Sequence, residues 1–536
     1  MPSDKDQEGL DLPSPINPFK FYELLDGYDE SERIWVFNGF RFGFRLMSET
    51  KPQNNEPVNH ISVRRNPEIA GKLIDEELRT GRISGPHDTK PFDQFHISPI
   101  KTVPKKDPNK HRKILNLSYP YDETSVNHGI SERNSTINYA SIQDCIEVIQ
   151  NMGQGCYLMK SDLKSAFRMV PIHPDDYPLL GFKFEGKYYY DRCLSQGASS
   201  SCQIFERIAT ALEWILRNKY GVKYCIHILD DFLMFAFSII TGRFYLKQWR
   251  KLCNDLGWII AEEKTEGPVQ CLVFSGISVD TVQMMASLPL DKLRKYADII
   301  KDASKSRKIT LREMQRIIGC LQFAVRVVVP GRPFIRRLID TIIGVNVPFH
   351  FVTLNKEAKK DLYMWETFLK YHNGKTFFLR DCITSNDVFL SSDASGFACA
   401  AVYQRDWFVI EFPDDWKDYS IELLELYPIV VAINVFGRQL CNRSVTFFCD
   451  NKAVTYIINK QTSPKKDIMI LIRNLVLTCM QYNIVLKCLH VRGRDNVLPD
   501  KLSRLQVSES LLREFGMAKN PTEVPTHLLP SNFKGL

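Results

Sequence analysis

The pattern of hydrophobic and polar positions divides the chain into five segments. Residues 1–60 are polar and interrupted by proline, with one short aromatic cluster, and predict a weakly organised leader. Between residues 61 and 284, short apolar runs alternate with amphipathic stretches, which is typical of a mixed α+β domain. Residues 285–385 are basic with a helical period, residues 386–506 return to alternating strands and helices, and residues 507–536 form a tail with little periodicity.

Two helices can be predicted from the spacing of their apolar residues. Apolar side chains recur on one face between residues 204 and 216. Thr310 and Glu313 have the spacing of a capping box, which indicates the start of a second helix, and Pro330 is expected to end it.

Length and composition narrow the class of protein. The 536 residues predict about three or four domains. A hydrophobic share of 44% and a charged share of 25% fit a folded chain and exclude fibrous or disordered classes. The 14 cysteines include no C-x-x-C pair, so we expect a reduced intracellular setting, the cytoplasm or nucleus. The longest nearly unbroken apolar run, Phe232–Ile240, is too short to span a bilayer, and no membrane association is expected.

Two adjacent acids give the strongest local signal for chemistry. Asp230 and Asp231 interrupt the apolar run of residues 224–237, which predicts a hairpin with both charges at its tip. Two unpaired like charges beside apolar strands are costly, so a bound cation is one interpretation. A solvated Asp-Asp turn explains this segment alone equally well.

A third acid favours the interpretation as a metal site. Asp162 follows an apolar run and, taken alone, would most often cap a helix. Together with Asp230 it could bind two Mg²⁺ ions, or Mn²⁺ in their place. Because neighbouring side chains of a strand point to opposite sides, we expect Asp230 to be the bridging ligand and Asp231 the weaker one.

These segments resemble those of a known enzyme family. SDLKSAF, LSQGASSSCQIF and HILDDFL are similar, in order, to motifs A, B and C of reverse transcriptases. VPKKDPNKHRKILNLSYP resembles their fingers segment, LGWIIAEEKTE their motif D and VFSGISV the approach to their primer grip. GRISGP, LSYPYDETSVNHGI, HPDDYPLLGF and ALEWILRN resemble DIRS-type retrotransposons, whose elements use a tyrosine recombinase. The resemblance implies an α+β right-hand polymerase with fingers, palm and thumb.

The resemblance also implies roles at the metal site and beside it. Asp162, Asp230 and Asp231 would form the polymerase metal site, and Leu163 would offer its backbone carbonyl. Phe167 would be the steric gate that rejects a ribose 2′-OH, although a plain core aromatic has the same spacing.

Further residues would bind the nucleotide. Lys105 and Arg112 would grip the triphosphate, and Gln196 with Gly197 would shape the pocket. Lys264 could be a general acid for the departing pyrophosphate, but a lysine among three glutamates is more often part of a surface ion pair.

A second set of acids lies in the C-terminal α/β segment. It consists of Asp393, Glu425, Asp450 and Asp500 at strand ends and helix starts, and such a set fits two further Mg²⁺ ions. Each acid alone could instead cap a helix or be solvated. Jointly they resemble the acids of ribonuclease H, which occur as D, E, D, D in this order, and imply an α/β ribonuclease H-like domain. Glu422 is an alternative to Glu425, which aligns better with the family helix.

The positive charge is concentrated in two segments. The net charge of the chain is only +8, but residues 285–345 hold 13 Lys and Arg against 5 Asp and Glu, and residues 101–113 hold 6 against 1. These segments correspond to a basic thumb and basic fingers, and Arg312 and Arg316 are expected to bind a nucleic-acid duplex. A solvated basic helix face is the alternative.

The leading hypothesis is an RNA-directed DNA polymerase with ribonuclease H activity that copies retroelement RNA. Its expected partners are an RNA template, a DNA primer, the RNA–DNA hybrid and deoxynucleoside triphosphates. The alternatives are that only one half is active, or that the chain is a co-opted relic that binds nucleic acid. We find no recombinase, integrase or protease motif, so a recombinase would be encoded elsewhere.

Overall fold

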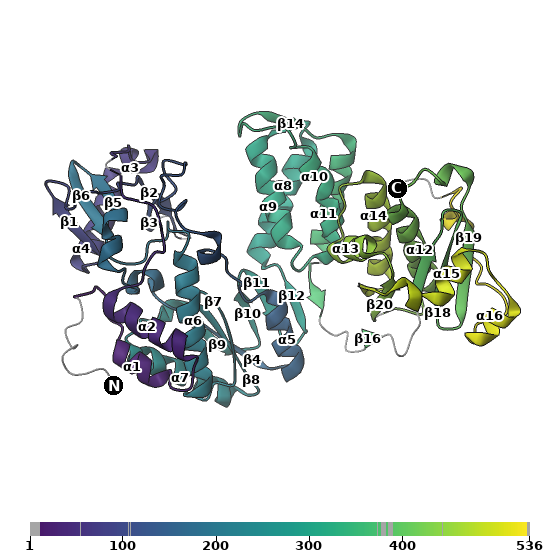
Figure 1. Cartoon of the computed structure of the whole chain (residues 1–536), viewed down its shortest axis with the longest axis horizontal. Coiled ribbons are helices and arrows are strands. Elements are labelled where there is room, and N and C mark those ends of the chain that lie inside the picture. The colour runs from purple at the N-terminus through teal and green to yellow at the C-terminus, as the bar shows by residue number, and fades with distance from the viewer. Residues whose placement is uncertain are drawn as a thin grey trace. The chain divides into compact units, whose positions relative to one another are not determined.

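The chain folds into two compact units, residues 1–275 and 276–536 (Figure 1). The computed structural model describes residues 11–53, 55–105, 107, 109–371, 373–376, 382–383, 390–441 and 443–532. Within these ranges, no helix combines the length and apolar character needed to cross a bilayer.

The first unit begins with two helices, α1 (Pro18–Leu24) and α2 (Glu30–Phe42). The Asp29 side chain caps α2 by accepting the Glu32 N–H at 3.0 Å. Phe40 of α2 is buried, and its ring lies 6.0 Å from that of Trp258. The prediction of a weakly organised leader is therefore wrong, because a few large apolar side chains anchor these polar helices to the core.

The fingers region follows. A three-stranded antiparallel sheet has the order β1-β6-β5, and a separate hairpin joins β2 to β3. The helices and strands of this region are α3 (Ile61–Arg65), α4 (Pro67–Arg79), β1 (Ile83–His87), β2 (Ile100–Pro104), β3 (His111–Leu115), β5 (Gly181–Phe184) and β6 (Lys187–Asp191).

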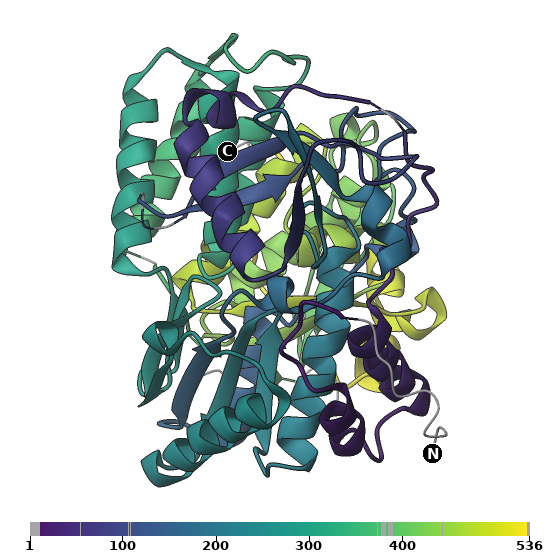
Figure 2. The ribbon, with the colours of Figure 1, turned by 90° about the vertical axis from the view of Figure 1, so that its left-hand side faces the viewer.

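The palm is a four-stranded antiparallel sheet of order β7-β8-β4-β9, whose strands lie side by side in Figures 1 and 2. The predicted helix over residues 204–216 is confirmed as α6, which packs its buried face against β7. The elements are α5 (Ile142–Met152), β4 (Tyr157–Asp162), α6 (Ser201–Asn218), β7 (Tyr224–Ile228), β8 (Asp231–Ala236), α7 (Ile239–Leu256) and β9 (Glu266–Val269).

The second unit opens with a helical region. The capping box is confirmed: Thr310 Oγ1 accepts the Glu313 N–H at 3.3 Å, and the Glu313 carboxylate accepts the Thr310 N–H at 2.8 Å. The helix it starts ends at Ala324, before Pro330, which lies in a 3₁₀ turn instead. The elements are β11 (Ile277–Asp280), β12 (Met285–Ser287), α8 (Leu290–Lys305), β13 (Lys308–Thr310), α9 (Leu311–Ala324), η6 (Val329–Phe334), α10 (Arg336–Asp340), β14 (Phe351–Thr353), α11 (Lys356–Tyr371) and β15 (Lys375–Thr376).

A mixed sheet forms the rest of the second unit. Its order is β19-β18-β17-β20-β21, antiparallel from β19 to β17 and parallel from β17 to β21, and β16 also pairs with β20. Helix α12 is apolar on nearly every side because it packs between the sheet and α14. The elements are β16 (Cys382–Ile383), β17 (Leu390–Ala394), β18 (Ala398–Tyr403), β19 (Asp406–Glu411), α12 (Ile421–Phe436), β20 (Ser444–Cys449), α13 (Lys452–Lys460), α14 (Lys466–Gln481), β21 (Val485–His490) and α15 (Val497–Ser503).

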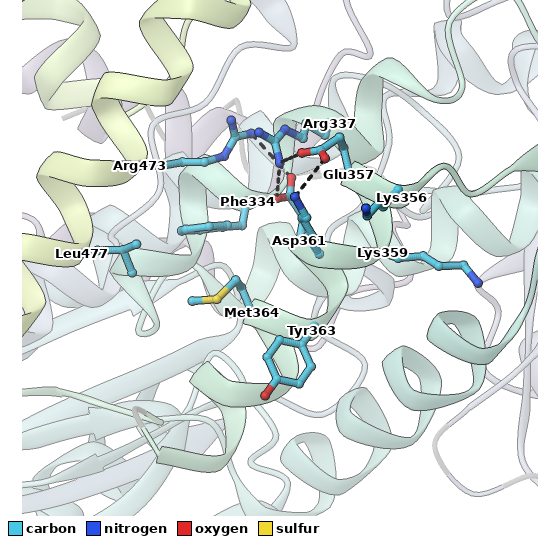
Figure 3. A pocket seen from close by; sticks show the side chains of 11 residues that line it. Phe334, Arg337, Lys356, Glu357, Lys359, Asp361, Tyr363, Met364, Arg473 and Leu477 are labelled. Carbon is cyan, nitrogen blue, oxygen red and sulfur yellow. Dashed lines mark hydrogen bonds and ion pairs between the residues drawn. The ribbon is translucent and has the colours of Figure 1, made fainter. Parts of the chain in front are cut away.

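A buried ionic cluster joins the helical region to this sheet domain. Arg473 of α14 lies 3.5 Å from Asp361 of α11, and it donates to the Pro333 carbonyl at 3.2 Å. Arg337 approaches Asp361 at 3.3 Å and Glu357 at 2.8 Å, beside a cavity of about 500 Å³ (Figure 3). These contacts tie the two parts of the unit together.

The C-terminal tail runs along the outer edge of the sheet. Helix α16 (Glu509–Glu514) is followed by a segment whose backbone bonds to β19 and the turn before it. Ala518 N–H donates to the Arg405 carbonyl at 2.8 Å, and Thr522 N–H donates to the Trp407 carbonyl at 2.7 Å. The Trp407 indole N–H donates in return to the Ala518 carbonyl at 2.8 Å.

Candidate active sites

The palm sheet brings three predicted acids together. Asp162 ends β4 and Asp231 begins β8, and the two are direct partners across the antiparallel ladder. Asp230 lies in the two-residue turn between β7 and β8, as the hairpin prediction requires. The Leu163 N–H donates to the Asp230 carbonyl at 3.1 Å, which fixes the turn beside the end of β4.

These acids destabilise one another's charged forms. Burial raises the pKa of Asp230 to about 6, and the nearby carboxylates of Asp162 and Asp231 add to the rise. Burial and Asp162 also raise the pKa of Asp231. Oxygen ligands packed at this charge density are the donors that Mg²⁺ and Mn²⁺ prefer, so the residues present fit a divalent cation.

Lys264 contacts this acid cluster directly. Its ammonium group lies 2.7 Å from the Asp162 carboxylate. Although burial opposes the charged form, Asp162, Asp230 and Asp231 raise the pKa of Lys264. The Lys264 side chain is 57% exposed, so it does form an ion pair near the surface, but its partner is Asp162. Glu262, one of the neighbouring glutamates, pairs with Arg250 instead.

The predicted nucleotide-pocket residues lie around the end of β3 and the start of α6. A side chain at Gly197 would collide with the Leu115 carbonyl, so only glycine allows this approach. The Gly197 carbonyl accepts from Asn127 Nδ2 at 2.9 Å, and Gln196 is exposed. Phe167 is half-buried, with its ring stacked on Phe205 at 5.0 Å, so one face packs on the core.

The predicted phosphate-binding cations are exposed. Lys105 follows β2, where its N–H donates to the Lys110 carbonyl at 2.7 Å, and Arg112 lies on β3. Within the described ranges, no hydrogen bond or ion pair connects either side chain to the palm acids. Arg312 and Arg316 are exposed on α9 of the second unit.

The second unit gathers the other four acids near one end of its sheet. Asp393 lies on β17 and Asp450 directly follows β20, the neighbouring parallel strand. Glu425 projects from α12 and Asp500 from α15, and both helices pack near these strands. Glu422 instead pairs with Lys465 at 3.1 Å, so Glu425 is the helix acid beside Asp393 and Asp450.

Burial raises the pKa of a carboxyl group in this second cluster further than in the palm cluster. Glu425 is 6% exposed, and burial followed by Asp393 and Asp450 raises its pKa to about 9. The Glu425 Oε2 atom is buried without a hydrogen-bond partner. Donor atoms of Glu425, Cys449 and Asp450 lie within 4.8 Å of one another. Because Mg²⁺ takes oxygen rather than thiol ligands, the fit to a divalent cation rests on the Glu425 and Asp450 carboxylates and on the orphaned Glu425 oxygen.

Three polar residues of this site were missed by the sequence analysis. Ser503 Oγ donates to Asp393 Oδ2 at 2.5 Å, and Arg504 Nε lies 2.8 Å from Asp500. Buried Asn496 donates to the Ser392 carbonyl at 3.0 Å. All three lie three or four residues, about one helical turn, from Asp500, and this spacing is the signal that could have identified them.

The segment that contains the palm acids is similar to a known family. Residues 103–279 match the family "Reverse transcriptase (RNA-dependent DNA polymerase)". The chain is 23% identical over 432 residues to the "Putative enzymatic polyprotein" of Cassava vein mosaic virus, covering 76% of this chain and 58% of that protein. It is 22% identical over 530 residues to the "Retrovirus-related Pol polyprotein from transposon 297" of Drosophila melanogaster, covering 94% and 44%. The chain thus spans about half the length of these relatives.

Solved structures show the same architecture. The foamy viral protease-reverse transcriptase dRH in complex with double-stranded DNA matches at a TM-score of 0.51 and 17% identity, covering 91% of this chain and 84% of that one. The foamy viral enzyme in complex with an RNA/DNA hybrid matches at 0.51 and 18%, covering 95% and 65%. The predicted polymerase fold with mixed α and β content is confirmed, and residues 103–279 form a reverse transcriptase domain of the kind found in Pol polyproteins. The ribonuclease H-like nature of the C-terminal domain stays a prediction.

Proposed function

We propose that this chain copies RNA into DNA at its palm and cuts the RNA strand of the resulting RNA–DNA hybrid in its C-terminal domain. The observation that carries the proposal is the convergence of acids in two separate places, Asp162 with Asp230 and Asp231 in the palm, and Asp393 with Glu425, Asp450 and Asp500 in the second unit. Phosphoryl transfer needs little more from a protein than positioning and charge, which such sites supply.

In the palm, Asp162, Asp230, Asp231 and the Leu163 carbonyl would hold two Mg²⁺ or Mn²⁺ ions. The ions would supply Lewis acidity toward the primer 3′-OH and the departing pyrophosphate. Lys264, 2.7 Å from Asp162 and with a raised pKa, would protonate the leaving group.

The rest of the palm and fingers would select and hold the nucleotide. Phe167, stacked on Phe205, presents its ring as the gate against a 2′-OH. Lys105 and Arg112 on the β2–β3 hairpin would bind the triphosphate, and Gln196 with Gly197 would line the base pocket.

In the C-terminal domain, the four acids would hold the cations that activate water for hydrolysis. Ser503 orients the Asp393 carboxylate, and Arg504 pairs with Asp500. Asp393 and Glu425 have pKa values raised by burial to about 6 and about 9, so binding the cations would release protons from these two acids.

The proposed origin is a retroelement of the DIRS type, supported by the sequence phrases GRISGP and LSYPYDETSVNHGI. The RNA template, DNA primer and deoxynucleoside triphosphates are proposed substrates, with any recombinase on another chain. The proposed setting is the cytoplasm or nucleus.

Two substitutions test the proposal separately in each domain. Asp230→Asn should abolish extension of oligo-dT on poly-rA in Mg²⁺ and leave cleavage of a preformed hybrid intact, and Asp450→Asn should do the reverse. Asp122→Asn, an exposed aspartate in a fingers turn, is the matched control. If the unaltered chain yields no product in Mg²⁺ or Mn²⁺ but still binds hybrid, the nucleic-acid-binding relic becomes the better explanation.

A further inference from the structure

A polar stripe crosses the otherwise apolar face of α6 that packs on β7. Glu206, Thr210 and Glu213 are spaced four and three residues apart, so they share one side of the helix. Their side chains face His227, a 7% exposed residue on β7. Thr210 is exposed, but the Glu206 and Glu213 side chains are only 13% and 17% exposed beside the buried histidine. Charges that are largely removed from water are costly unless they are paired, which indicates that the two glutamates and His227 form a unit.

His227 bridges the two glutamates. Its Nδ1 lies 2.6 Å from Glu213 Oε2, and its Nε2 lies 3.4 Å from Glu206 Oε1. The face of its ring stacks on buried Phe232 of β8, with the ring centroids 5.4 Å apart. The histidine is thus fixed in orientation by both strands of the hairpin and by the helix behind them.

The second oxygen of Glu206 reaches the tip of the hairpin. Glu206 Oε2 accepts the backbone N–H of Leu229 at 3.1 Å. Leu229 has φ +53°, a left-handed conformation that hairpin turns usually assign to glycine, asparagine or aspartate. The next residue is Asp230. The strained turn that carries this carboxylate is therefore held from behind by a glutamate that is itself held by His227.

We propose that Glu206 is a positioning residue for the polymerase site, and that the Glu213–His227–Glu206 chain fixes the Leu229–Asp230 turn in the geometry that metal binding and primer attack require. This proposal rests on the proposed polymerase function only where it predicts a change in kcat. The effect of Glu206 on the Leu229–Asp230 turn can be measured in a chain without activity. Neither Glu206 nor His227 touches the reacting atoms.

The first test is hydrogen–deuterium exchange of peptides covering residues 224–237 in the full chain. Glu206→Leu removes the acceptor for the Leu229 N–H, whereas Glu206→Gln keeps one. Glu32→Leu is the matched control, because Glu32 pairs with Arg207 on the same helix without reaching the hairpin. We expect faster exchange in the hairpin for Glu206→Leu alone. An unchanged hairpin, or an increase spread evenly over the first unit, would overturn the positioning role.

The second test is single-nucleotide incorporation. Displacing a catalytic group by about 1 Å costs about 100-fold in rate, so Glu206→Leu should lower kcat by that order while KM for the nucleotide stays nearly constant. Glu206→Gln should recover most of the rate. A matched rise in KM, or equal losses in both variants, would contradict the proposal. If the hairpin responds as expected while the unaltered chain incorporates nothing, the polymerase function fails and the positioning role of Glu206 remains.

Discussion

The positive charge on His227 makes the free energy of unfolding of the first unit depend on pH. The two glutamates outweigh burial, which opposes the imidazolium, and raise the pKa of His227 to about 9 from the ordinary 6.5. A group with a raised pKa in the folded state stabilises the fold fully below its unfolded pKa, and that stabilisation is lost as the pH rises through the folded pKa. The affected interval is therefore pH 6.5 to about 9.

The size of the effect follows from the shift. A pKa of 6.5 for His227 in the unfolded protein and of about 9 in the folded protein corresponds to about 3 kcal/mol in the free energy of unfolding. His227→Gln removes the titrating group and leaves Glu206 and Glu213 facing each other without a cation. We expect the variant to be less stable at pH 6.5 and to lose less stability than the unaltered protein by pH 9.5.

The assay is urea-dependent hydrogen exchange of peptides from β7, β8 and α6, which reports on this region separately from the second unit. Cysteines and lysines that titrate over the same pH interval change the free energy of unfolding equally in the unaltered protein and in His227→Gln. Their contribution therefore cancels when the two proteins are compared. If the two proteins lose the same free energy between pH 6.5 and 9.5, His227 does not carry the charge and the reasoning fails.

Three other sets of substitutions give independent tests. Lys264→Met should lower the rate of nucleotide incorporation about 100-fold at saturating Mg²⁺, because it removes the proposed proton donor, whereas Lys264→Arg should lose less; equal rates in both variants would exclude the role. Replacing Arg312 and Arg316 by glutamine should reduce the slope of log affinity against log salt for a hybrid by about 1.8, measured by fluorescence anisotropy, and an unchanged slope would count against this helix as a duplex-binding surface. Replacing the buried pair of Figure 3 with Asp361→Asn and Arg473→Met should raise the urea midpoint of the second unit, since burial raises the pKa of Asp361 to about 6 and lowers that of Arg473. A lower midpoint would show that the pair stabilises the fold.

The palm acids could be predicted from the sequence because their chemistry interrupts a strong local pattern. Asp230 and Asp231 break an apolar strand run, and the hairpin follows from that run alone. The partner of Lys264 could not be predicted in this way, because Asp162 lies 102 residues away and three glutamates are closer along the chain. Tertiary contacts, rather than sequence distance, decide such pairings.

The two N-terminal helices could not be predicted from the sequence for a different reason. Their apolar side chains are few, and prolines between residues 12 and 18 dilute the period, so the pattern is typical of an irregular segment. What stabilises α2 is the insertion of Phe40 and Val36 into the core of the first unit, and only the fold shows this. Ser503 differs again, since its spacing of three residues from Asp500 is visible in the sequence but its hydrogen-bond acceptor, Asp393, lies 110 residues away.

The backbone bonds from the tail to β19 have a consequence for handling the protein. An edge strand with open N–H and C=O groups is a template for another chain, and covering such an edge is a common defence against aggregation. A recombinant fragment that stops after α15 would keep all seven acids and yet expose the edge at Arg405 and Trp407. The C-terminal tail, whose sequence shows little periodicity, thus determines where the C-terminal domain can be shortened for expression without exposing an edge that promotes aggregation.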